Sequence, residues 1–180
     1  MDTNIARILI DRDRIAARVQ ELAAEIAATY DGGHVELTLV PILSGAIIFL
    51  ADLIRHLPLK MKIALVQLSA YPGATTSPRD PRTLLELTGD VAGRHVLIVD
   101  DILDSGRTLR RVQAMVRERE PQSVRSVVLL RKPGKAPPDV KVDFLGFDID
   151  DLFVVGYGLD YGGLYRNYPH VAVLNPELLP

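Results

Sequence analysis

The sequence contains no cysteine, and its acidic and basic side chains nearly balance, leaving a net charge of −2 at pH 7. Without cysteine there is no disulfide framework, no thiolate metal site and no cysteine nucleophile. The pI is about 6.1, whereas domains that bind nucleic acid through charge usually have a pI above about 9. We therefore expect no nucleic-acid partner.

Long apolar runs and targeting segments are also lacking. The apolar stretch Leu39–Ala51 is interrupted by Pro41, Ser44 and Gly45, and it is shorter than the roughly 18 residues of a membrane span. Residues 1–4 show no basic segment followed by an apolar core, so no signal peptide is expected. The 180 residues, 48% of them hydrophobic, suffice for one buried core. These features predict a soluble, cytoplasmic, single-domain protein (residues 1–180) with no membrane partner.

The hydrophobic pattern alternates between helix and strand. Apolar residues recur at helical spacing in three segments, which cover about 11–30, 46–57 and 107–119. Short apolar runs predict strands at 35–42, 61–68, 84–88, 95–99 and 124–130, with shorter ones near 144, 153–155 and 171–173. This alternation predicts an α/β fold in which helices flank a mostly parallel central sheet.

One segment, residues 70–82 (AYPGATTSPRDPR), contains three prolines and cannot form regular structure. Loops of this length in compact domains often cover a functional site. We expect a mobile lid here, and the alternative is a long surface loop without a function.

The strongest functional signal is the run HVLIVDDILDSGRTL at residues 95–109. A buried strand delivers Asp100 and Asp101 at its carboxyl end, which is the edge where ligands bind in open α/β sheets. The turn Asp104–Thr108 then offers backbone N–H groups, hydroxyls and a helix N-terminus, which together suit a phosphate monoester. Because carboxylates repel phosphate, their presence here predicts a ligand that also carries sugar hydroxyls or a metal ion.

This run resembles the fingerprint with which phosphoribosyltransferases bind 5-phosphoribosyl-1-pyrophosphate. Response-regulator receivers also end a strand with paired aspartates, but their pair lies near the start of the fold, whereas here it lies past the midpoint. Leu43–Gly45 resembles the first pyrophosphate loop of the family, and Lys132–Pro133 with residues 143–161 resembles the purine-binding hood of its 6-oxopurine branch. The resemblance covers about residues 5–175. It implies the type I phosphoribosyltransferase fold, with a small hood subdomain formed by the N-terminal segment and about residues 143–180.

The resemblance implies an activity in purine salvage. A Mg²⁺-dependent pentosyltransferase would move the phosphoribosyl group from 5-phosphoribosyl-1-pyrophosphate to hypoxanthine or guanine, giving IMP or GMP and pyrophosphate. It also implies a homodimer or homotetramer. The alternatives are an enzyme for xanthine or for adenine, although Lys132 disfavours adenine, and an RNA-binding regulator of the same fold with little turnover. The net charge of −2 and the lack of a Lys/Arg-rich run disfavour the regulator.

Roles for individual residues follow from the same resemblance. Asp104 would be the general base that takes the proton from N7 of the purine, and the alternative is a helix N-cap, for which aspartate is favoured. The phosphoribosyl group would be bound by Asp100, Asp101, Asp104, Ser105, Gly106, Arg107 and Thr108. Pyrophosphate would be bound by Leu43, Ser44, Gly45 and Arg166.

The purine would be bound by Ile102, Lys132, Phe153, Val154 and Asp160. Within this set Lys132 would donate to the 6-oxygen, Phe153 would stack on the base, and the Val154 backbone would read its edge. Mg²⁺ would be held by Asp100 and Asp101, with Asp160 supporting a second ion. Tyr71 would belong to the lid.

Some positions depart from the family pattern. Ser44 stands where relatives usually carry Lys or Arg, Ala70 stands where the lid usually has Ser, and Asp100 stands where the 6-oxopurine branch more often has Glu. A further acidic group, Asp148, Asp150 and Asp151, is similar to a calcium loop but lacks its other ligands. We expect a solvated acidic turn there.

Overall fold

The computed structural model describes residues 4–30, 35–69 and 82–178. A seven-stranded sheet forms its centre, and strands β2, β6, β7 and β8 lie side by side in that order and run parallel. Their bounds are Leu37–Leu43, His95–Leu103, Ser123–Arg131 and Phe144–Asp148. At the other side of β2 the sheet continues with β3 (Met61–Ile63), β4 (Val66–Ser69) and the antiparallel β5 (Arg82–Leu85). The prediction of an α/β fold with a mostly parallel sheet is confirmed.

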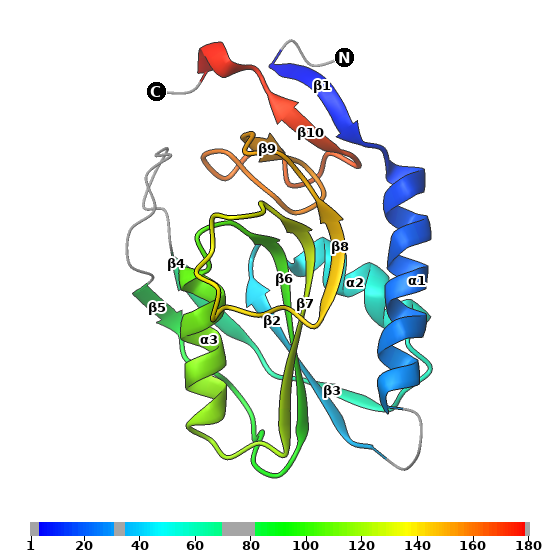
Figure 1. Cartoon of the computed structure of the whole chain (residues 1–180), viewed down its shortest axis with the longest axis vertical. Coiled ribbons are helices and arrows are strands. Elements are labelled where there is room, and N and C mark those ends of the chain that lie inside the picture. Colours follow the sequence, from blue (N-terminus) through cyan, green and yellow to red (C-terminus); the bar gives the residue numbers. More distant parts are fainter. Residues whose placement is uncertain (1–3, 31–34, 70–81, 179–180) are drawn as a thin grey trace.

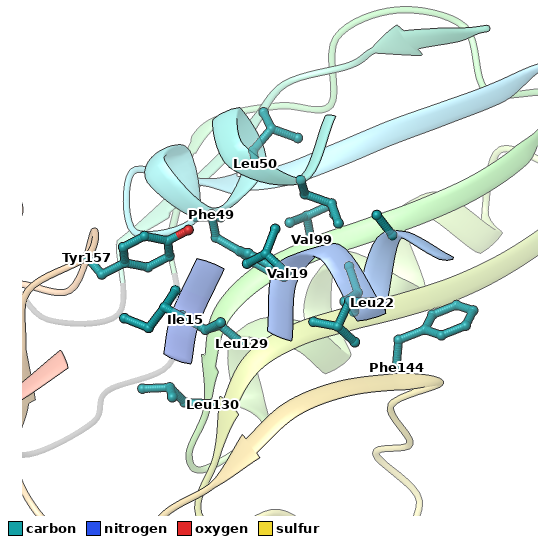
Figure 2. Close-up of a cluster of buried hydrophobic side chains, with 14 of the residues drawn as sticks. Ile15, Val19, Leu22, Phe49, Leu50, Val99, Leu129, Leu130, Phe144 and Tyr157 are labelled. Carbon is teal, nitrogen blue, oxygen red and sulfur yellow. The ribbon is translucent and has the colours of Figure 1, made fainter. Parts of the chain in front are cut away.

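Helices cover both faces of this sheet (Figure 1). Helix α1 (Arg12–Tyr30) and helix α2 (Ile47–His56) share one hydrophobic cluster with Leu97 and Val99 of β6. Helix α3 (Arg107–Arg117) shares the other cluster with Val96 and Ile98. Because successive side chains of a strand point to opposite faces, β6 is buried on both sides. Figure 2 shows part of the first cluster, with Phe49 of α2 and Val19 of α1 against the strands.

A second, three-stranded sheet lies beyond the carboxyl ends of the parallel strands (Figure 1). It is antiparallel in the order β1-β10-β9, with bounds Ile5–Ile10, Val171–Leu174 and Val154–Val155, and the short 3₁₀ helix η1 (Pro176–Leu178) follows it. The two ends of the described chain therefore meet in one small sheet. Its position places residues 154–174 above the edge where the sequence predicts the site.

Three elements differ from the sequence-based prediction. Strand β5 spans Arg82–Leu85 instead of residues 84–88, so Arg82 belongs to a strand although the segment 70–82 was expected to be irregular. The single strand expected at 61–68 is divided into β3 and β4, because Ala64 N donates to the Leu39 carbonyl between them and β4 then pairs further along β2. Strand β6 continues past Val99 to Leu103, since its pairing with β7 runs on through Asp100 and Ile102. Across the described parts of the chain, no helix combines the length and apolarity that crossing a membrane requires.

Candidate active site

The predicted acidic pair, Asp100 and Asp101, lies near the carboxyl end of β6. The Asp100 side chain is buried, and its burial, together with the charge of neighbouring Asp101, raises its pKa well above the usual range. Burial also raises the pKa of Asp101, while hydrogen bonds and the nearby Arg166 guanidinium act in the opposite direction. Two adjacent carboxylates in such surroundings favour a ligand that brings hydroxyl donors or a cation.

Three segments come together at Asp101. A Cβ on Gly45, in the loop after β2, would lie 1.9 Å from Asp101 Oδ2, so only glycine fits there. A Cβ on Gly158, whose φ is +103°, would lie 2.2 Å from the Gly45 carbonyl oxygen. The predicted pyrophosphate loop therefore contacts the Asp101 side chain, and the segment after β9 packs on the backbone of that loop.

Arg166, from the segment after β9, also lies close to Asp101 and Gly158. One guanidinium nitrogen donates to the Gly158 carbonyl at 2.6 Å, and the other pairs with Asp160 Oδ1 at 2.6 Å. Asp160 Oδ2 also accepts from Gly163 N at 2.7 Å. Arg166 is thus held with its charge near Asp101, where an anionic leaving group could meet it.

The turn after β6 leads into the N-terminus of helix α3. Helix α3 begins at Arg107, and its N-cap is Gly106, with a φ of 75° and no capping side chain. A Cβ on Gly106 would come within 3.0 Å of Ala136 Cβ, so the turn also packs tightly. The alternative role of Asp104 as the N-cap is wrong, because the cap lies two residues further on. Ser105 of the turn is partly buried, and so is Thr108 at the second position of the helix, whereas Arg107 is exposed at the first position.

Asp104 instead pairs with Lys132. Lys132 follows β7 directly, and its backbone N–H donates to the Leu103 carbonyl at 3.0 Å, which fixes it beside the end of β6. Its side chain is buried, and Nζ donates to Asp104 Oδ2 at 3.1 Å. The structure therefore brings together a carboxylate and an ammonium group that the sequence assigned to the same ligand.

Two further residues of this cluster were missed by the sequence analysis. Lys135 Nζ lies 3.2 Å from Asp104 Oδ1 and 2.8 Å from both carboxylate oxygens of Asp151. Asp151 Oδ1 also pairs with Lys132 Nζ at 3.1 Å. The prediction of a solvated acidic turn is therefore incomplete: Asp151 is exposed but paired. Asp148, the last residue of β8, accepts two hydrogen bonds from Arg131, at 2.7 and 2.9 Å.

The remaining predicted residues belong to β6, to the start of β9 and to the end of β2. Ile102 is partly buried and packs on the α1/α2 cluster, while Phe153 and Val154 lie at the start of β9. The Phe153 ring meets that of Tyr161 edge-on, with 5.5 Å between centroids. Leu43 ends β2, and Ser44 after it is exposed, joined to Leu43 by a cis peptide bond. Tyr71 and most of the predicted lid lie outside the described residues.

A divalent cation would need ligands beyond the protein. No group of three or more His, Asp or Glu side chains in the described ranges could hold a metal ion. Mg²⁺ commonly takes only one or two carboxylates and completes its shell with water and substrate oxygens. Asp100 and Asp101 fit that pattern, provided that the substrate itself carries several oxygens.

Comparison with known proteins gives consistent results. A family model described as "Phosphoribosyl transferase domain" matches residues 8–162. Hypoxanthine-guanine phosphoribosyltransferase of Bacillus subtilis is 39% identical over 178 residues, which cover 99% of this chain and 98% of that protein. Hypoxanthine phosphoribosyltransferase of Salmonella typhimurium is 40% identical over 165 residues, 92% of this chain and 93% of that one. The crystal structure of a hypoxanthine phosphoribosyltransferase from Staphylococcus aureus superimposes with a TM-score of 0.90 at 33% identity, covering 100% of this chain and 97% of that chain.

Proposed function

The chain belongs to the phosphoribosyltransferase family and has its type I fold, and we propose that it is a purine-salvage enzyme acting on hypoxanthine or guanine. The activity is the transfer of a phosphoribosyl group from 5-phosphoribosyl-1-pyrophosphate to the base. The relatives named for hypoxanthine or hypoxanthine-guanine, which match along nearly the whole chain, support this substrate class.

The pairing of Asp104 with Lys132 is the observation that carries the proposal. A 6-oxopurine presents its 6-oxygen and N7 on one edge of the ring system. An ammonium donor and a carboxylate acceptor 3.1 Å apart are complementary to that edge when N7 carries a proton. Adenine instead presents an amino donor at position 6, which a lysine donor cannot satisfy.

The chemistry then requires few further groups. Asp104 accepts the proton from N7 as N9 bonds to C1′ of the ribose and the bond from C1′ to the pyrophosphate oxygen breaks. The leaving pyrophosphate carries negative charge, which Arg166 and the backbone of Leu43–Gly45 would stabilise. The 5′-phosphate would bind at the N-terminus of α3, along Ser105–Thr108, and the ribose hydroxyls would face Asp100 and Asp101.

Mg²⁺ fits this arrangement as the cofactor. Asp100 and Asp101 would hold it together with oxygens of the substrate, and Asp160 would support a second ion. When bound, the ion neutralises part of the pyrophosphate charge. Cytoplasmic location and assembly as a homodimer or homotetramer remain predictions of the family resemblance.

A turnover assay with single purine bases tests the proposal. The purified protein is mixed with 5-phosphoribosyl-1-pyrophosphate, Mg²⁺ and one of hypoxanthine, guanine, xanthine or adenine, and nucleotide formation is measured. We expect product with hypoxanthine, guanine or both, and none with adenine. Loss of the product in EDTA supports the need for a divalent cation. Failure to form a nucleotide from either hypoxanthine or guanine would reject the proposed function.

A further inference from the structure

Four side chains of alternating charge form a closed ring that includes Asp104, the predicted general base. Asp104 Oδ2 pairs with Lys132 at 3.1 Å and Asp104 Oδ1 with Lys135 at 3.2 Å. Asp151 closes the ring, since it lies 3.1 Å from Lys132 Nζ and 2.8 Å from Lys135 Nζ. Each oxygen of the Asp104 carboxylate therefore has its own lysine.

We propose that Lys135 is a positioning residue for catalysis: anchored by Asp151, it holds the Asp104 carboxylate through Oδ1 while Oδ2 takes the purine proton. This inference rests on the proposed roles of Asp104 and Lys132. It adds a second lysine that touches neither the base nor the donor and acts through Asp104.

The ring must open when a purine binds. Lys132 would then donate to the 6-oxygen, so the hydrogen bond that it makes to Asp104 Oδ2 is shared or lost. A carboxylate held at one oxygen only could rotate away from the N7 proton. Lys135 approaches the opposite oxygen and is not needed for the 6-oxygen, so it can keep its contact throughout the reaction.

Asp151 explains how Lys135 stays in place. Both carboxylate oxygens of Asp151 accept from Lys135 Nζ at 2.8 Å, and this interaction is the largest cause of the raised pKa of Lys135. Lys135 is therefore charged at neutral pH and directed toward Asp104. The side-chain exposure rises along the ring, from 9% at Lys132 and 26% at Asp104 to 37% at Lys135 and 62% at Asp151.

This difference in exposure predicts which substitution reduces turnover more. An exposed ion pair alone contributes little, so Asp151 matters mainly through Lys135. The contact between Lys135 and Asp104 lies deeper and bears directly on the reacting carboxylate. Substitution of Lys135 should therefore reduce turnover more than substitution of Asp151.

Steady-state kinetics of Lys135→Gln and Lys135→Arg test the inference, with Lys141→Gln as the matched control. Lys141 is an exposed lysine on the same connection between β7 and β8. We expect Lys135→Gln to lower kcat about tenfold, which is within the range of coupling energies between residues in contact. The KM for hypoxanthine and the KM for 5-phosphoribosyl-1-pyrophosphate should each stay within about twofold of wild type. Lys135→Arg should recover most of the turnover, and Lys141→Gln should match the wild type.

A double-mutant cycle separates positioning from a merely structural role. If Lys135 acts through Asp104, then Lys135→Gln should lower kcat no further in the Asp104→Asn background. A kcat of the single Lys135 variant within about twofold of wild type, or an equal loss in both backgrounds, would overturn the inference and leave the proposed function intact. Wild-type turnover of Asp104→Asn alone would instead remove the proposed base, and with it the role of Lys135.

Discussion

Gly45, in the loop after β2, contacts Asp101 of β6 so closely that a Cβ on Gly45 would stand 1.9 Å from Asp101 Oδ2. The loop after β2 and the end of β6 consequently hold each other in place. Gly158 packs on the Gly45 carbonyl from the other side, with room for no Cβ. The position of the Asp101 carboxylate is thus set by its contact with the Gly45 backbone as well as by β6 itself.

Gly45→Ala should therefore impair binding of the pyrophosphate donor. The added methyl group displaces the Asp101 carboxylate, and we expect KM for 5-phosphoribosyl-1-pyrophosphate to rise about tenfold or more, equivalent to roughly 1.4 kcal/mol of binding. Gly93→Ala is the control, because its Cβ would meet nothing within 4 Å although its φ is +63°. That variant should lose stability without a change in donor KM; equal donor KM for Gly45→Ala and wild type would contradict the contact.

Asp100→Asn should stabilise the metal-free protein at neutral pH. The raised pKa of Asp100 means that the folded state binds more protons than the unfolded state above the unfolded pKa of about 3.9. The contribution of Asp100 to the free energy of unfolding is therefore largest at low pH, and it falls as the pH rises toward the pKa of Asp100 in the folded state. The Asn variant lacks this loss, so its Tm in EDTA should exceed that of wild type at pH 7.5.

The difference in Tm should shrink as the pH is lowered toward 4, because Asp100 is then protonated in the wild type too. Thermal unfolding followed by circular dichroism at several pH values measures it. Asp139→Asn, at a carboxylate that is 59% exposed, should show no comparable gain. A lower Tm for Asp100→Asn across the whole pH range would contradict the prediction that the buried Asp100 carboxylate destabilises the folded protein at neutral pH.

Lys132→Ala should weaken binding of oxopurines. Removing the ammonium leaves the 6-oxygen and Asp104 Oδ2 without a partner, which typically costs about 1–3 kcal/mol. We expect KM for hypoxanthine and guanine to rise accordingly, while KM for the donor stays within about twofold. An unchanged KM for every oxopurine would exclude the proposed contact, and Lys141→Ala serves as the control on the same connection.

Tyr157→Phe should loosen the segment that carries Gly158. The Tyr157 hydroxyl donates to Asp52 Oδ2 of α2 at 2.6 Å, and burial raises its pKa strongly. A hydrogen bond to a charged group contributes about 1.5–3 kcal/mol, so the free energy of unfolding should fall by that amount in urea titrations. Tyr161→Phe removes an exposed hydroxyl that bonds the Leu178 carbonyl, and it should cost clearly less.

The local hydrophobic pattern of the sequence was sufficient to predict most strands of the parallel sheet and the helices that cover it. Strands β6 and β7 are short apolar runs buried on both faces, and α1 follows the spacing of Ile15, Val19 and Leu22, which are all buried. The helix starts where Asp11 Oδ1 accepts from the N–H groups of Asp13 and Arg14. Pairing between distant segments was not accessible in this way, since β1 joins β10 only through the tertiary fold.

The same distinction applies to the site. Asp100, Asp101 and Asp104 could be found because they form one continuous motif with a recognisable turn. Lys135 and Asp151 could not, because they are 16 residues apart and meet only where β8 returns alongside β7. The sequence signal that remained was the spacing of Lys132 and Lys135 on one tight turn, which is too common to indicate a function by itself.

Turnover of Asp104→Asn, measured together with donor affinity, tests the central claim most directly. The account predicts that kcat with hypoxanthine falls by about 10²–10⁴-fold, the usual contribution of a general base. Binding of 5-phosphoribosyl-1-pyrophosphate with Mg²⁺ should stay close to wild type, because the phosphate turn and the acidic pair are intact. A variant with wild-type kcat, or one whose loss is explained by weakened donor binding alone, would contradict it.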